Sequence, residues 1–218
     1  MARPRNEDRI DIPGRAVQAA AQLFAERGVD AVSLAEIAAA AGCRAPALYR
    51  YFPDKDALLL AVHDEGFRRL YGVKLDAGGA ARSSAWERLR LGGLAYVRFA
   101  LENPELYELM FLERGPYRRL AALRAAGDPD AVDFAARSLA FLKTSVLACQ
   151  EEGYLSGLDP DVAAFTFWSA VHGAVSLALR RRAPFAAVDP AAIAAQAVET
   201  MITLTAATRT VRATPAPG

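Results

Sequence analysis

Apolar side chains recur every three or four positions along most of the chain, and almost no segment shows the strict alternation of a half-buried strand. Helix-capping residues mark the ends of these periodic segments. Asp11 with Pro13 is typical of a helix start, Gly28 of a helix end, and Ser33 with Glu36 forms a capping box. In the N-terminal part, these signals predict helices over residues 11–28, 33–41, 44–52 and 54–72. The pattern indicates an all-α protein.

A glycine-rich segment that is poor in apolar residues, residues 76–84, separates these helices from longer ones and predicts a domain boundary. Beyond it, helices are expected over residues 86–101 and 105–113, and from starts near residues 130, 160 and 190. Each of these three starts places an N-cap aspartate before a proline that the first helical turn tolerates: Asp128-Pro129, Asp159-Pro160 and Asp189-Pro190. The tail, residues 208–218, is expected to be disordered.

The two short helices, 33–41 and 44–52, are separated by only two residues, which is the spacing of a helix-turn-helix. The first of the two residues between the helices, Gly42, can adopt the left-handed backbone of a tight turn. On the second helix, Leu48 and Phe52 lie four positions apart and are expected to face the core. The other side chains include no carboxylate and suit the major groove of DNA: Arg44, Ala45, Ala47, Tyr49, Arg50 and Tyr51.

The first quarter of the chain closely resembles the DNA-binding domain of the TetR family, in the pattern LFAERG followed by AAAAGCRAPALYRYFPDKDAL. This resemblance implies a transcriptional repressor that binds a palindromic operator as a homodimer and is released by a small-molecule effector. It divides the chain into a DNA-binding domain, a connecting helix, an effector-binding and dimerisation domain, and the tail, over residues 1–53, 54–75, 76–207 and 208–218.

By the family pattern, Tyr49 and Lys55 contact DNA phosphates and Ser33 caps its helix beside the DNA backbone. The residues that read or approach bases are Arg44, Ala45, Pro46, Ala47, Tyr49, Arg50 and Tyr51. Arg44 departs from the family, which usually has Ser or Thr there, and either a phosphate or a base contact suits it. Each of these residues, taken by itself, also has a structural alternative. The tyrosines are then half-buried aromatics, the charged residues lie on a solvated surface, and the capping box only stabilises its helix.

Trp168, His172 and Gly173 resemble the Trp, His-Gly pattern of one C-terminal subgroup of the family. Bulky side chains on several helices suit a pocket for a hydrophobic or aromatic effector. The candidate lining residues are Tyr96, Phe99, Tyr107, Met110, Phe111, Phe141, Phe165, Trp168 and His172. For each of them a packed core is the alternative, and for His172 that alternative is a hydrogen bond to a carbonyl or hydroxyl group.

The last two long helices, near residues 160–181 and 190–207, carry almost no charge, and the second has very little polar face. A helix that is apolar nearly all round must be buried, which predicts a homodimer through these two helices. Residues 162–179 reach the lower limit of transmembrane length, but they include polar residues and have no partner span, so no membrane segment is predicted.

The charge balance, 26 Lys and Arg against 25 Asp and Glu, argues mildly against a nucleic-acid partner. Locally, however, residues 43–51 contain Arg44 and Arg50 and no acidic residue, so the balanced overall charge does not exclude DNA binding. Cys43 and Cys149 form no CxxC pair, which fits a reducing cytoplasm without a metal or other cofactor. Alternative hypotheses are a small all-α enzyme that uses His172 or His63, and a redox role for Cys43.

Overall fold

The computed structural model of the protein describes residues 11–79, 84–111, 120–122, 124–125, 132–180 and 189–207. These residues form helices and turns, with no strand among them, which confirms the predicted all-α fold. The helices divide between two compact units. One consists of Met1–Gly66 and Glu105–Val132, and the other of Phe67–Pro104 and Asp133–Gly218.

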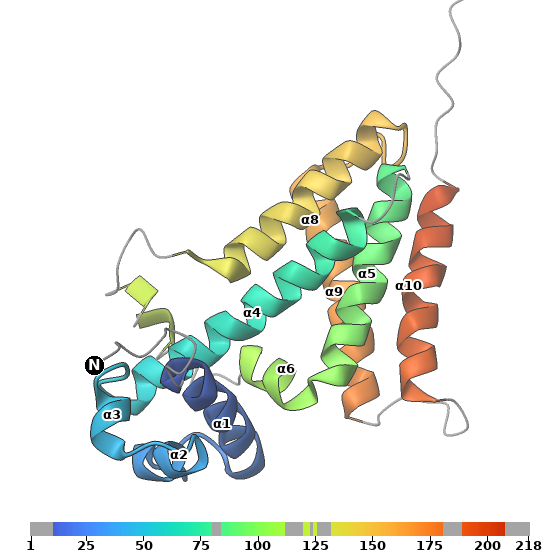
Figure 1. Ribbon diagram of the computed structural model, residues 1–218. Coiled ribbons are helices and arrows are strands. Elements are labelled where there is room, and N and C mark those ends of the chain that lie inside the picture. The colour runs from blue at the N-terminus through green and yellow to red at the C-terminus, as the bar shows by residue number, and fades with distance from the viewer. Residues whose placement is uncertain are drawn as a thin grey trace, which may run out of the picture. The chain divides into compact units, whose positions relative to one another are not determined.

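The first unit is built on three helices at the N-terminal end of the chain (Figure 1). These are α1 (Ile12–Arg27), α2 (Leu34–Ala40) and α3 (Ala45–Tyr49), and the unit also takes in the start of α4 (Lys55–Gly79) and nearly all of α6 (Pro104–Met110). The helices α1, α2 and α3 pack against one another in every pairing. Their core includes Ala16, Ala20, Phe24, Leu34, Ile37, Ala38 and Leu48. The predicted apolar periodicity thus becomes the shared interior of this unit.

The second unit is a helical bundle in which α5 packs against three other helices (Figure 1). Its helices are the remainder of α4, α5 (Ala85–Glu102), α8 (Phe134–Glu151), α9 (Pro160–Leu179) and α10 (Pro190–Ala206). At one point of this bundle, Trp86 stacks on Tyr154 with ring centroids 4.6 Å apart. Val146, Val175 and Val198 are at most 1% exposed, so the unit has its own dry core.

The starts predicted near residues 160 and 190 are confirmed. α9 and α10 begin at Pro160 and Pro190, and in each the preceding aspartate accepts hydrogen bonds from two backbone amides of the first turn. The third start differs, because α8 begins at Phe134 under a cap from Asp133. Asp128-Pro129, on which that prediction rested, lies outside the described residues, as do the segment 80–83 and the predicted disordered tail, 208–218.

Two predicted helix ends are wrong. α4 does not end near Gly72 but continues to Gly79, and α3 ends at Tyr49, three residues before Phe52. Nothing lies within 4 Å of the position that a Cβ on Gly72 would occupy, so no close contact requires a glycine or a chain turn there. The burial of Leu70 and Lys74 in the second unit holds this part of α4 in place. Tertiary packing therefore outweighs the local stop signal.

By length and composition alone, α9 could cross a membrane, with a mean hydropathy of 1.6 over 18 residues. Core helices of helical bundles meet the same criterion, so a single such helix is a weak indication. Within the second unit, α9 packs against α5, α8 and α10.

Adjacent glycines on α5 allow a matched pair of stability variants. Gly92 is buried but has nothing within 4 Å of a Cβ position, whereas a Cβ on Gly93 would lie 2.9 Å from Val198 Cγ1. Gly92→Ala should raise the free energy of unfolding by up to about 1 kcal/mol through helix propensity. In Gly93→Ala this gain is opposed by overpacking that costs about 1–3 kcal/mol. Urea denaturation followed by circular dichroism measures both, and equal stability of the variants would contradict the packing argument.

Candidate nucleic-acid interface and ligand cavity

The turn between α2 and α3 has the predicted helix-turn-helix geometry. Gly42 has a φ of +68°, and a Cβ there would lie 2.5 Å from Arg15 Nη2. The turn is closed by backbone hydrogen bonds, from Gly42 N to Ala39 O at 3.0 Å and from Cys43 N to Ala38 O at 2.9 Å. A side chain at position 42 would be strained by the left-handed backbone, whereas the end of the flexible Arg15 side chain could move away from it. The requirement for glycine therefore comes from the backbone conformation.

The short helix α3 divides into a buried and an exposed face as predicted. Leu48 is fully buried and Phe52, just beyond the helix, is 8% exposed, whereas Tyr49 and Tyr51 are 52% and 51% exposed. The other predicted contact residues lie at the surface or are half-buried: Arg44, Ala45, Pro46, Ala47 and Arg50. Across the described part of the chain, the side chains of the two tyrosines, Arg44 and Arg50 form no hydrogen bond, ion pair or ring contact. This face thus offers donors and aromatic edges to an outside partner.

Arg44 precedes α3 as its N-cap residue, with extended backbone angles and no capping hydrogen bond from its side chain. Since a guanidinium group has no acceptor, it cannot bond the first amides as the usual Ser or Thr would. Pro46 removes one of those amides altogether. The Arg44 side chain is consequently available for an external contact.

Ser33 forms the predicted capping box with Glu36. Its hydroxyl donates to Glu36 Oε2 at 2.7 Å and accepts from Glu36 N at 3.3 Å, while Ser33 N donates to the same carboxylate at 2.8 Å. These bonds, together with a 2.8 Å ion pair to Arg27, lower the pKa of Glu36 to about 2. The structural role of Ser33 is therefore clear, and its place beside the DNA backbone stays a prediction.

Lys55 has a structural role that the sequence did not indicate. Its Nζ donates to Asp30 O at 3.2 Å and to Val32 O at 3.1 Å, which ties the start of α4 to the loop before α2. An ammonium group has three donors, so one remains for a phosphate. We conclude that Lys55 also braces the helix-turn-helix.

The candidate effector residues separate into two groups. Tyr107, Met110 and Phe111 belong to the first unit, whereas the others belong to the second: Tyr96, Phe99, Phe141, Phe165, Trp168 and His172. Within the second unit, Tyr96, Phe141 and Trp168 line a cavity of about 40 Å³ between α4, α5, α8, α9 and α10. Phe99 is buried, and Phe165 is 57% exposed on α9.

His172 does not line this cavity but is bonded beside it. Its Nδ1 lies 3.2 Å from the Tyr96 hydroxyl and its Nε2 lies 3.4 Å from Ser176 Oγ, so each ring nitrogen has a hydroxyl neighbour. Burial, and to a smaller extent Arg180, lowers the pKa of His172. The arrangement matches the structural alternative, in which a core histidine is hydrogen-bonded to hydroxyl groups.

Lys74 is the residue of this cavity that sequence reasoning missed. Its side chain lines the cavity, it is 7% exposed, and burial lowers its pKa to about 8. The available signal was its position four residues after Leu70, which places both on one face of α4. Elsewhere, no cluster of three or more His, Cys, Asp or Glu side chains suited to a metal occurs among the described residues.

Comparison with known proteins now identifies the family. Residues 16–62 match the family model described as bacterial regulatory proteins, tetR family, and residues 89–201 match that of the tetracyclin repressor-like C-terminal domain. The chain belongs to the TetR family. It is accordingly a DNA-binding, helix-turn-helix regulator of transcription. Membership of the Trp, His-Gly subgroup stays a prediction.

One relative supports this assignment, and two solved structures show the same fold. An uncharacterized HTH-type transcriptional regulator of Mycobacterium tuberculosis is 32% identical over 148 residues, which cover 61% of this chain and 73% of the relative. A Rhodococcus protein of unknown function has the same fold, with a TM-score of 0.72 at 24% identity, over 93% of this chain and 100% of the other. A tetR-family regulatory protein from Rhodococcus has a TM-score of 0.63 at 22% identity, over 89% and 97%.

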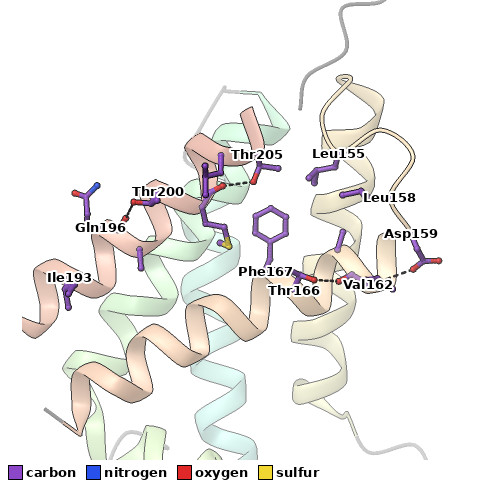
Figure 2. Close-up of a pocket in the computed structure, with 14 residues that line it drawn as sticks. Leu155, Leu158, Asp159, Val162, Thr166, Phe167, Ile193, Gln196, Thr200 and Thr205 are labelled. Atoms are coloured by element: carbon purple, nitrogen blue, oxygen red, sulfur yellow. Dashed lines mark hydrogen bonds between the residues drawn. The ribbon is translucent and has the colours of Figure 1, made fainter. Parts of the chain in front are cut away.

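The second unit of this TetR-family protein also has an open groove of about 830 Å³ between α9, α10 and the loop before α9 (Figure 2). Leu158, Val162 and Leu204 line it and are 52%, 64% and 69% exposed. The threonines in the groove donate to carbonyls of their own helices: Thr166 to Val162, Thr200 to Gln196 and Thr205 to Met201. Because these hydroxyl hydrogens are already used, the groove presents a mainly apolar surface.

Proposed function

We propose that this TetR-family regulator is a cytoplasmic repressor that binds a palindromic operator as a homodimer and leaves it when a small, mainly apolar effector binds. The observation that carries the DNA-binding part is the exposed surface of α3 and its flanking residues, where the side chains of Arg44, Arg50 and the two tyrosines have no partner in the described part of the chain. Membership of a helix-turn-helix family supports a docking mode in which α3 lies in the major groove.

The proposed DNA contacts are Ser33, Arg44, Ala45, Pro46, Ala47, Tyr49, Arg50, Tyr51 and Lys55. Small side chains at positions 45 and 47 allow close approach of the helix, and the flanking arginines supply donors for guanine edges or phosphates. We assign these contacts to a DNA-binding domain of residues 1–53. The connecting helix then covers residues 54–75, and residues 76–207 bind the effector and the second subunit.

The proposed dimer uses the groove between α9 and α10, with a second copy of this chain as its occupant. Exposed apolar side chains on both helices favour burial, and among the described residues the only charged side chain that lines the groove, Asp159, caps the first turn of α9. Such a surface needs an apolar partner, and a two-fold contact between identical faces supplies one. Two linked recognition helices would then match the two halves of a palindrome.

The proposal that an effector releases the protein from DNA rests on side chains that line both the cavity and the groove. Phe167 and Met201 line both of them, so a ligand that displaces these side chains acts on the proposed subunit contact. The rings of Tyr96, Phe141 and Trp168 would pack on the apolar part of this ligand. No specific observation favours catalysis by His172, whose ring nitrogens already have hydroxyl neighbours.

Selection of DNA fragments from a genomic library by the purified full-length protein tests this function. We expect enrichment of a palindrome and a complex of two chains per duplex, measured by native mass spectrometry. Enrichment of a site without two-fold symmetry, bound by one chain, would overturn the operator and dimer together.

A further inference from the structure

Lys74 is a buried cation whose partners are all uncharged. Its Nζ donates to the backbone oxygen and the hydroxyl of Ser138, both at 3.0 Å, and lies 5.7 Å from the centroid of the Phe141 ring. No acidic side chain in the described part of the chain forms an ion pair with it. Two of the three ammonium donors are therefore used, and the positive charge is not neutralised.

Such a position is costly for a lysine. Burial of an unpaired ammonium group is unfavourable, and an aliphatic side chain of similar length could fill the space without that cost. The lowered pKa, about 8, records the cost but still leaves the group mainly protonated at neutral pH. The charge thus calls for a counter-ion that the described residues do not provide.

The surroundings of Lys74 indicate which counter-ion fits. The described residues that line the same cavity include a second cation, Arg88, and no carboxylate, and the rest of them are mainly apolar and aromatic. Gly92 lines it too, and the space beside its Cα is open. An anion that enters would meet positive charge and no acidic group.

We propose that the cavity binds the carboxylate of an organic acid with an apolar body, and that Lys74 is the residue that holds the carboxylate. This proposal rests on the proposed function, because it specifies the chemistry of the effector. The present volume, about 40 Å³, suits the head group alone. The body would extend toward Phe167 and Met201, where the flexible methionine can move aside.

Matched pairs of charged and neutral probes test the proposal on the full-length protein at pH 7. Octanoate and phenylacetate are compared with octanamide and phenylacetamide by isothermal titration calorimetry. We expect at least one carboxylate to bind about tenfold or more tighter than its amide, the effect of one charge-assisted hydrogen bond. Equal affinity within both pairs, or no binding by either carboxylate, overturns the proposal.

Variants then locate the charge. Lys74→Met should reduce the preference for carboxylate over amide to about twofold or less, whereas Lys74→Arg should keep a preference because it keeps a cation. Lys143→Met is the matched control, since it removes an exposed lysine that pairs with Asp161 on the surface. A Lys74→Met protein that is folded by circular dichroism and still prefers carboxylate contradicts the assignment. If Lys74→Met does not fold, Lys74→Arg alone tests the assignment, and loss of the carboxylate preference in that variant would contradict it.

Operator binding separates this inference from the proposed function. Loss of the carboxylate preference with intact operator binding would overturn only the effector chemistry. A clear preference in a protein that binds no palindrome would overturn the repressor and leave the cavity assignment standing.

Discussion

Replacement of Leu204 by aspartate is expected to convert the protein from a dimer to a monomer and to weaken operator binding about 100-fold or more. Leu204 is the most exposed of the large apolar side chains in the α9 and α10 groove, at 69%. In a two-fold contact the change places two carboxylates in an apolar surface, and none of the described residues that line the groove is a cation that could pair with them. Sedimentation equilibrium should give the mass of a single chain, 23.4 kDa, in place of twice that value.

Leu139→Asp is the matched control for this variant. Leu139 is 47% exposed on α8 and does not line the groove, so the same substitution there should leave the mass and the operator affinity unchanged. Because both leucines are exposed in the single chain, neither change should unfold the subunit. A dimeric Leu204→Asp protein, or monomers produced only by Leu139→Asp, would place the subunit contact elsewhere.

Arg44→Ala should weaken operator binding about 30-fold or more, because each of the two chains loses a contact of the kind that contributes about 1–3 kcal/mol, which is at least about 2 kcal/mol for the dimer. Arg44 has no partner in the described part of the chain, so the loss should come without a fall in helicity or melting temperature. Electrophoretic mobility shift titrations on the selected operator measure the affinity. Lys143→Ala, which removes one positive charge from the second unit, is the control for overall charge.

The same variant distinguishes the two roles that the sequence leaves open for Arg44. Loss of a phosphate contact should weaken binding to all sequences and lower the slope of log affinity against log salt by about one per chain. Loss of a base contact should instead relax the preference at one operator position in each half-site. Unchanged affinity on the operator would remove Arg44 from the interface.

Much of the DNA-binding unit could be predicted from the sequence because its signals are local. The capping box of Ser33, the left-handed Gly42 and the inward Leu48 each depend on residues within a few positions of one another. Local hydrogen bonds and backbone sterics determine such features before any tertiary contact forms. The aspartate and proline starts of α9 and α10 were predictable for the same reason.

The ligand cavity was far less predictable. Tyr96, Phe141 and Trp168 were found by their size, but Phe165 shares their composition and is exposed. Periodicity marks a face as apolar and cannot say whether the same chain or a second copy covers it. For that reason the sequence could nominate α9 and α10 as a subunit contact, while only packing showed which of their side chains remain uncovered.

By itself, then, the sequence determined the helical elements, their capped starts, the turn of the helix-turn-helix and the family. Tertiary structure alone decided that Lys55 bonds the loop before α2, that α4 continues to Gly79, and that Lys74 is buried against Ser138. Lys74 and Ser138 are 64 positions apart, so no local pattern joins them. The cost of a buried charge depends on what surrounds it in space, and that environment exists only once the helices have packed.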